Sequence, residues 1–83
     1  GKPILILQGD EDKVVPPEQA EKMYNALLEK NIPTGYLLFS GEGHGFRKKE
    51  NIIKSIESEL YFYQTIFGQK VTSSTPPFQI DNI

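Results

Sequence analysis

The 83-residue sequence contains no cysteine. It can therefore form neither a disulfide framework nor a thiolate metal site, and its redox compartment stays undetermined. A chain this short buries only about 60–65% of the surface that it exposes when unfolded. We therefore expect at most one small domain, with marginal stability in the absence of partners.

Long apolar runs and an excess of basic residues are also missing. No apolar stretch approaches the roughly 20 residues that a membrane span requires, and the N-terminus lacks the basic-then-apolar layout of a signal peptide. The net charge is −2 at pH 7, whereas a nucleic-acid surface would concentrate lysine and arginine. The one basic cluster, Arg47-Lys48-Lys49, is short and predicts a solvated turn. We expect no nucleic acid and no membrane as partners.

Two short apolar runs predict β-strands. Ile4-Leu5-Ile6-Leu7 is continuous and ends at Gly9, and Tyr36-Leu37-Leu38-Phe39 is bounded by Pro33 and Gly35 on one side and by glycines on the other. Runs without polar alternation are typical of strands buried on both faces, as in a parallel sheet.

Each predicted strand is followed by a predicted helix. The first helix is expected to begin at Pro16-Pro17-Glu18, because proline is tolerated in a first helical turn. It is expected to stop at Asn31, with Pro33 just beyond. The second runs from Lys49 to Phe67, with Gly68 as its stop. Apolar residues at helical spacing are Ala20, Met23, Tyr24, Leu27 and Leu28 in the first helix and Ile52, Ile53, Ile56, Leu60, Tyr63 and Phe67 in the second.

The order of elements predicts an α/β fold, a βαβα arrangement with two parallel strands and two helices. Two parallel strands alone leave their edges uncovered, so the pattern favours one end of a larger doubly wound domain. Residues 69–83 lack any period and are rich in serine, threonine and proline. We expect them to form an extended or disordered tail, with Phe78 and Ile80 as candidates for docking.

Polar residues follow both predicted strands. Asp10, Glu11 and Asp12 come after the first, and the only histidine, His44, lies in Gly41-Glu42-Gly43-His44-Gly45-Phe46 after the second. Loops at the carboxyl ends of neighbouring parallel strands converge. A carboxylate bonded to histidine Nδ1 fixes the tautomer and leaves Nε2 free to accept a proton. Histidine suits this role because its unperturbed pKa, about 6.5, lies close to neutral pH. Spacing alone leaves open which of the three acids pairs with the ring.

The remaining features of these loops have simpler interpretations. Gly41, Gly43 and Gly45 are expected to adopt positive φ and so to present the ring. The acid cluster lacks the alternating ligands and glycine of a calcium-binding loop, so we expect no metal site. The aromatic residues of the second helix are expected to be core and docking residues.

Gly9-x-x-Asp12-x-x-Val15-Pro16, Gly43-His44-Gly45 and the helix start Pro17-Glu18-Gln19 together resemble a known family. They are similar to the C-terminal part of the catalytic domain of the prolyl oligopeptidase family, above all its acylaminoacyl-peptidase and dipeptidyl-peptidase-like members, over residues 2–68. The resemblance implies an α/β-hydrolase fold, with Asp12 as the acid and His44 as the base of a Ser-Asp-His triad. It also implies a peptide substrate and no cofactor.

The sequence departs from the family pattern because it contains no Gly-x-Ser-x-Gly nucleophile motif and no oxyanion-hole strand. A chain without these groups is expected to be inactive alone. Residues 1–68 then form the C-terminal part of a hydrolase domain, and its remainder is the expected partner. Gly1 is not expected to be a natural start, since no initiator methionine is present.

Two alternatives stay open. An esterase or a dienelactone-hydrolase-like enzyme can carry similar acid and histidine loops. Alternatively, the chain acts as a non-catalytic module that forms a homodimer through the edge of its first strand. Dimers could equally arise because the rest of a domain is missing.

Overall fold

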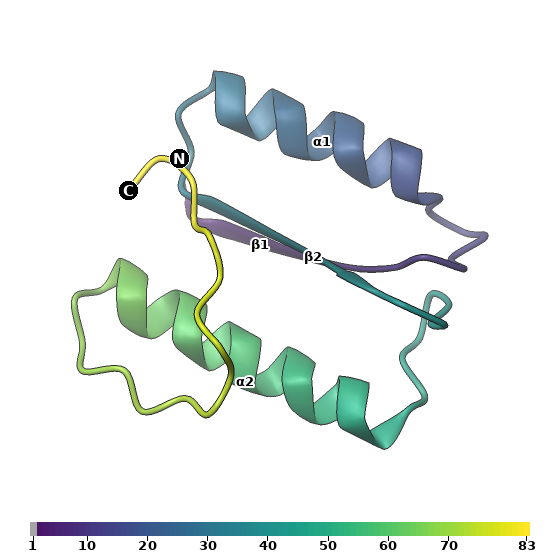
Figure 1. Ribbon diagram of the computed structural model, residues 1–83. Helices are drawn as coiled ribbons and strands as arrows, with labels where there is room; N and C mark the ends of the chain where they lie inside the picture. The colour runs from purple at the N-terminus through teal and green to yellow at the C-terminus, as the bar shows by residue number, and fades with distance from the viewer. Residues whose placement is uncertain (1) are drawn as a thin grey trace.

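The computed structural model describes residues 2–83 and contains four regular elements. These are strand β1 (Ile4–Gly9), helix α1 (Pro17–Glu29), strand β2 (Thr34–Phe39) and helix α2 (Lys49–Ile66). Figure 1 shows α1 on one face of the two-stranded sheet and α2 on the other. The predicted α/β class and βαβα order are confirmed.

The two strands run parallel, in a register from Ile4 opposite Thr34 to Gly9 opposite Phe39. Strand β2 begins two residues earlier than predicted, at Thr34, and includes Gly35. Pairing with β1 explains the extension, because a strand continues as long as its neighbour offers hydrogen-bonding groups. The register also brings both strands to an end at the same edge of the sheet.

Burial of both strands on both faces was predicted and is wrong for much of their length. Residues 4–7 of β1 are half-buried, and Leu38 of β2 is 53% exposed. The helices cover the faces of the sheet, but in a sheet of two strands each strand has one edge without a neighbouring strand. The buried apolar residues are Ala20, Phe39 and Phe62.

Both helices end in a residue with positive φ. Asn31 follows α1 with φ of 58°, and Gly68 follows α2 with φ of 68°. A left-handed residue just beyond a helix turns the chain away, and glycine and asparagine adopt this conformation most readily. The predicted stops at Asn31 and Gly68 are therefore where the helices terminate.

Most of the apolar stripe of α2 lies on the surface. The exposed members are Ile52, Ile53, Ile56, Leu60, Tyr63 and Phe67, whereas the buried residues of α2 are Ser58, Phe62 and Gln64. Of the aromatic residues assigned to core and docking, only Phe62 lies in the core described here. A stripe of this kind is surface that a further layer of protein would cover.

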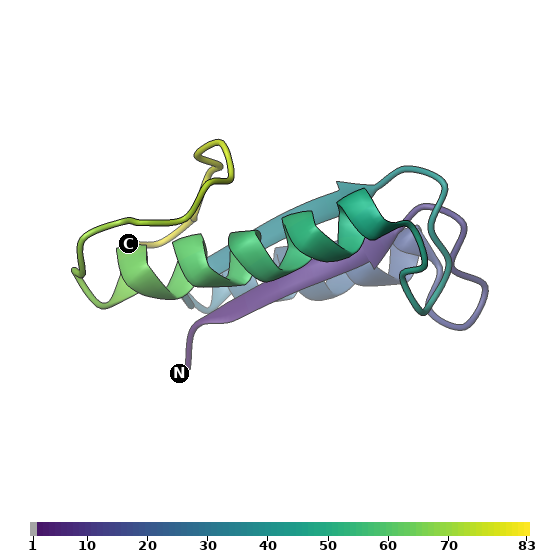
Figure 2. The same ribbon diagram turned by 90° about the horizontal axis from the view of Figure 1, so that it is seen from below.

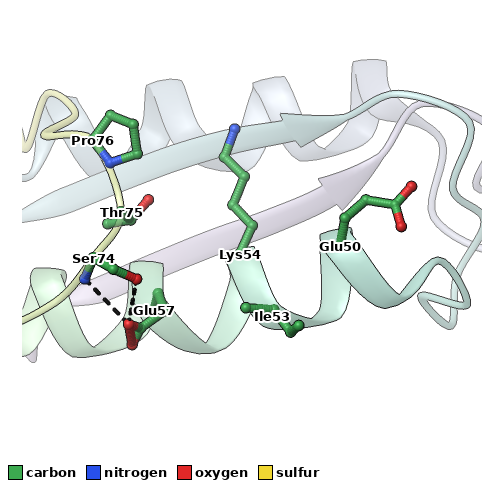
Figure 3. A pocket seen from close by; sticks show the side chains of 7 residues that line it. All are labelled: Glu50, Ile53, Lys54, Glu57, Ser74, Thr75 and Pro76. Atoms are coloured by element: carbon green, nitrogen blue, oxygen red, sulfur yellow. Dashed lines mark hydrogen bonds between the residues drawn. The ribbon is translucent and has the colours of Figure 1, made fainter.

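The tail, residues 69–83, contains no helix but is tied to α2 and β2. Ser73 Oγ donates to the backbone oxygen of Glu57 at 2.6 Å, and Ser74 donates through its N–H and its hydroxyl to the Glu57 carboxylate. Figure 3 shows Glu57 and Ser74 beside a small pocket between α2 and the tail. The Phe78 ring packs 4.8 Å from that of Tyr61, measured between centroids.

The far end of the tail reaches the sheet. Asp81 pairs with Thr34 in an isolated antiparallel bridge, through N–H to oxygen contacts of 2.8 and 3.0 Å. Its carboxylate also accepts a hydrogen bond from the Tyr24 hydroxyl of α1. The tail therefore joins α1, β2 and α2. Neither helix in residues 2–83 has the length and apolar character needed to cross a membrane.

Candidate functional site

Two loops meet at the carboxyl ends of the strands. The acid loop (residues 10–16) follows β1, the histidine loop (residues 40–48) follows β2, and Figure 2 shows both at the end to which the strand arrows point. Glu11 N–H donates to the backbone oxygen of Glu42 at 2.9 Å, and Gly41 N–H donates to the Asp10 carboxylate at 2.8 Å. These cross-loop bonds hold the two loops in fixed register.

Asp12 and His44 face each other across these loops. Asp12 Oδ2 lies 3.0 Å from His44 Nδ1. The Asp12 side chain is only 6% exposed, whereas that of His44 is 61% exposed. A buried acceptor on Nδ1 favours the tautomer with the proton on that nitrogen. The contact with Asp12 thus involves Nδ1 and leaves the other ring nitrogen, Nε2, outside this pair.

Asp12 is held from behind by its own loop. Its Oδ1 accepts hydrogen bonds from the N–H groups of Val14 and Val15, both at 2.9 Å. The buried side chain of Gln8 donates to the Val15 oxygen at 2.7 Å, which closes the loop. One carboxylate oxygen therefore anchors the loop, and the other is directed at His44.

These donors keep the carboxylate ionised. The Val15 N–H, foremost, and then the His44 and Val14 donors hold the pKa of Asp12 below its usual value, against the opposing effect of desolvation. Because this pKa is lowered on folding, the ionised carboxylate stabilises the fold above its unfolded pKa. That contribution is lost as the pH falls through the lower folded value.

The neighbouring acids do not contact the ring within the described chain. The Asp10 carboxylate accepts the N–H of Gly41 in the histidine loop. Glu11 is exposed and joins the histidine loop through its backbone. Of the three acids that spacing left open, Asp12 is the one paired with His44.

The expectation of positive φ at all three glycines of the histidine loop is wrong for two of them. Gly41 has φ of 73°, but Gly43 and Gly45 lie outside the left-handed region. A close backbone approach requires glycine at Gly9 as well, at the end of β1. A Cβ atom there would lie 2.2 Å from the Glu42 oxygen and 2.5 Å from the Gly43 oxygen. The two loops approach so closely that no side chain fits between them.

Gly9→Ala is therefore expected to lower the free energy of unfolding by about 1–3 kcal/mol, the usual cost of forcing atoms into a packed site. The clash involves backbone atoms of the histidine loop, which cannot rotate away as a flexible side chain can. The midpoint of urea unfolding, followed by circular dichroism, measures the effect.

Gly45→Ala is the matched control, because a Cβ at Gly45 meets no atom within 4 Å and the backbone there is not left-handed. It is expected to leave the unfolding midpoint nearly unchanged. Equal midpoints for the two variants would show that the loops can separate without cost, contrary to the packing described.

Glu42 is a residue that the motif analysis did not single out. Its side chain is 2% exposed and accepts hydrogen bonds from the N–H groups of Arg47 and Lys48 and from the Asn51 amide. The Arg47 N–H, foremost, lowers the pKa of the Glu42 carboxyl, although burial opposes the shift. The available signal was a charged residue between two glycines, a few residues before a helix without a side-chain N-cap.

The described part of the chain contains no set of side chains suited to bind a metal ion. No group of three or more His, Cys, Asp or Glu side chains within residues 2–83 is arranged to hold a metal ion. What the site offers is one ionised carboxylate beside one largely exposed imidazole, a pair that suits proton transfer.

The chain is similar to proteins of one known family. The model of the prolyl oligopeptidase family matches residues 1–70. Dipeptidyl peptidase family member 6 of Caenorhabditis elegans is 40% identical over 78 residues, which cover 94% of this chain and 10% of that protein. Dipeptidyl aminopeptidase BIII of Pseudoxanthomonas mexicana is 46% identical over 50 residues, 60% of this chain and 7% of that protein.

A solved structure shares the fold. The structure of a Mycobacterium tuberculosis puromycin-hydrolyzing peptidase superposes with a TM-score of 0.80 at 43% identity, covering 95% of this chain and 12% of that one. The chain spans about a tenth or less of the length of these curated relatives. The βαβα arrangement is thus part of an α/β-hydrolase fold, and the chain belongs to the prolyl oligopeptidase family of serine peptidases.

Proposed function

We propose that Asp12 and His44 are the acid and the base of a Ser-Asp-His triad in a full-length serine-type peptidase. The observation that carries the proposal is the 3.0 Å contact between Asp12 Oδ2 and His44 Nδ1. It lies at the carboxyl ends of parallel strands, where α/β enzymes gather their catalytic groups. It also lies within the stretch that matches a serine peptidase family.

The proposed mechanism is acyl transfer. His44 Nε2 accepts the proton of a serine hydroxyl as the serine oxygen attacks the peptide carbonyl carbon, and then gives that proton to the departing amine. The ionised Asp12 stabilises the imidazolium that exists between these two steps. A water molecule, deprotonated by the same nitrogen, then attacks the acyl carbon; the ester bond to the serine breaks, and the imidazolium returns its proton to the serine oxygen.

The nucleophile in this mechanism comes from outside the 83 residues. None of their serines lies in a Gly-x-Ser-x-Gly motif. We therefore propose that this chain supplies only the acid and the base and is inactive by itself. The oxyanion donors, which carry much of the electrostatic stabilisation in acyl transfer, also belong to the rest of the domain.

We propose that the rest of that domain is the partner that covers the exposed apolar surfaces of this chain. The exposed stripe of α2 is a wide apolar face, and the sheet of two strands leaves β1 without a neighbour on its other side. A homodimer through the β1 edge would use the same surfaces. We favour the remainder of the hydrolase domain, because the relatives are about ten times longer than the matched stretch.

We propose peptides as the substrate class. Matched relatives are named dipeptidyl peptidases, and matched structures are named puromycin hydrolases. Both the family and these names favour amide hydrolysis over the esterase or dienelactone-hydrolase-like alternative. Compared on the full-length protein, the rates with a peptide 4-nitroanilide and with a simple 4-nitrophenyl ester distinguish the two.

Treatment of the full-length protein with a fluorophosphonate probe is expected to label one serine outside residues 1–83. An activated serine attacks the phosphorus and stays covalently bound, whereas ordinary serines do not react. Mass spectrometry of the digested adduct identifies the modified residue.

The chain's own serines provide the internal control, because none of them lies in a Gly-x-Ser-x-Gly motif. Labelling at Ser40, Ser55, Ser58, Ser73 or Ser74, or no labelling at all, would refute the proposed triad.

A further inference from the structure

Glu42 is a buried carboxylate in an exposed loop. Its side chain is 2% exposed, although His44, two residues later, is largely open to solvent. Acidic side chains are rarely buried to this degree unless their charge is compensated. The contacts of this carboxylate therefore show what its burial achieves.

The compensation comes from the start of α2. Oε1 accepts the Arg47 N–H at 3.0 Å, and Oε2 accepts the Lys48 N–H at 3.1 Å and the Asn51 side-chain amide at 2.8 Å. Lys48 is the N-cap residue of α2, and its own side chain makes no capping bond. The Glu42 carboxylate thus clamps the segment after His44 onto the first turn of the helix.

The backbone of Glu42 makes a second set of contacts, with the acid loop. Its oxygen accepts the Glu11 N–H at 2.9 Å and packs against Gly9, where no Cβ could fit. A single residue therefore fastens the histidine loop both to the loop that carries Asp12 and to α2. His44 lies between the Glu42 anchor and the Arg47 and Lys48 groups that Glu42 binds.

We propose that Glu42 is a positioning residue that holds His44 in line with Asp12. The proposal rests on the proposed function, since it gives His44 a proton-transfer role. The His44 ring has little packing of its own, so the loop must supply the order that burial supplies elsewhere. A displaced catalytic group is costly, and a misplacement of about 1 Å can lower a rate about 100-fold.

Only a carboxylate satisfies all three donors. An ionised carboxyl accepts at both oxygens, whereas a glutamine amide has one oxygen and one NH₂ group. In Glu42→Gln the NH₂ group would face an N–H donor, in a site too buried for water to intervene. The loop would then have to shift to relieve the clash of donors.

The test uses the full-length protein with a peptide 4-nitroanilide. Glu42→Gln is expected to lower kcat by about 10- to 100-fold per active site and to leave KM within about twofold. The number of competent sites is counted by titration with a fluorophosphonate. This separates a slower site from a smaller folded population, because a purely structural residue would change only the number of titrated sites.

Glu57→Gln is the matched control. Glu57 lies on α2, its carboxylate also accepts hydrogen bonds, and the Ser74 hydroxyl and N–H lower the pKa of its carboxyl. It fastens the tail instead of the histidine loop, as Figure 3 shows. The same chemical change there is expected to leave kcat and KM at wild-type values.

A kcat per titrated site equal to wild type in Glu42→Gln would overturn the proposal, whatever the stability of the variant. If Glu42→Gln does not fold, Asn51→Ala decides, because it removes one donor and leaves both backbone bonds. It is expected to lower kcat about 3- to 10-fold, and an unchanged kcat would overturn the proposal. His44→Ala separates a failure of the proposed triad from a failure of the proposed role of Glu42, since an active His44→Ala variant refutes the triad itself.

Discussion

His44→Ala in the full-length protein is expected to lower kcat by about 10⁵- to 10⁶-fold, the loss seen when a triad histidine is removed from a serine protease. Without the imidazole no group in the described loops can take the proton of the attacking serine. The exposed ring makes few packing contacts, so the fold should survive the change. Steady-state hydrolysis of a peptide 4-nitroanilide measures the effect.

Lys49→Ala is the control for this variant, because Lys49 is an exposed residue at the start of α2 without a role in the proposed site. Its kcat should equal that of the wild type. A His44→Ala protein that keeps even a tenth of the wild-type kcat would remove His44 from the mechanism.

Asp12→Asn is expected to lower kcat by about 10⁴-fold and to leave the fold intact. The Asn oxygen can take over the hydrogen bonds from Val14 and Val15, which turns the NH₂ group toward His44. The ring must then accept at Nδ1 and carry its proton on Nε2. In that tautomer it cannot accept the proton of the serine. The pH dependence of kcat/KM, measured beside the rate, tests this explanation.

The lowered pKa of Asp12 fixes how activity should depend on pH. Because the carboxylate stays ionised down to a pH below its ordinary pKa, its protonation should cause no loss of activity between pH 5 and neutrality. Glu11→Gln is the control for the choice of acid, because Glu11 is exposed and meets the histidine loop only through its backbone. Equal losses in Glu11→Gln and Asp12→Asn would show that the wrong acid was assigned.

The location of the site could be predicted from the sequence. Apolar runs, helical periodicity and the turn residues Asn31 and Gly68 are local signals, and they placed every element to within a few residues. Because parallel strands end at one edge of a sheet, the positions of the acid cluster and His44 already implied that they meet. The choice of Asp12 among three acids came from resemblance to a family, not from spacing.

The surroundings of the site could not be predicted in this way. Glu42 looked like one more polar residue in a glycine-rich loop, and its burial follows from the fold of the chain between β2 and α2. The requirement for glycine at position 9 likewise depends on a backbone oxygen more than thirty residues away along the chain. The outward face of α2 reflects what lies beside the sheet, which periodicity alone does not report.

The sequence by itself determined which segments form strands and helices and which residue types stand at the strand ends, because these depend on interactions between near neighbours. The tertiary structure pairs His44 with the acid that the family resemblance had named, and it alone decided which carboxylate is buried to fix the histidine loop and which helix face stays uncovered. These outcomes depend on contacts between residues far apart in the chain, whose geometry exists only once β1, β2 and α2 have packed together.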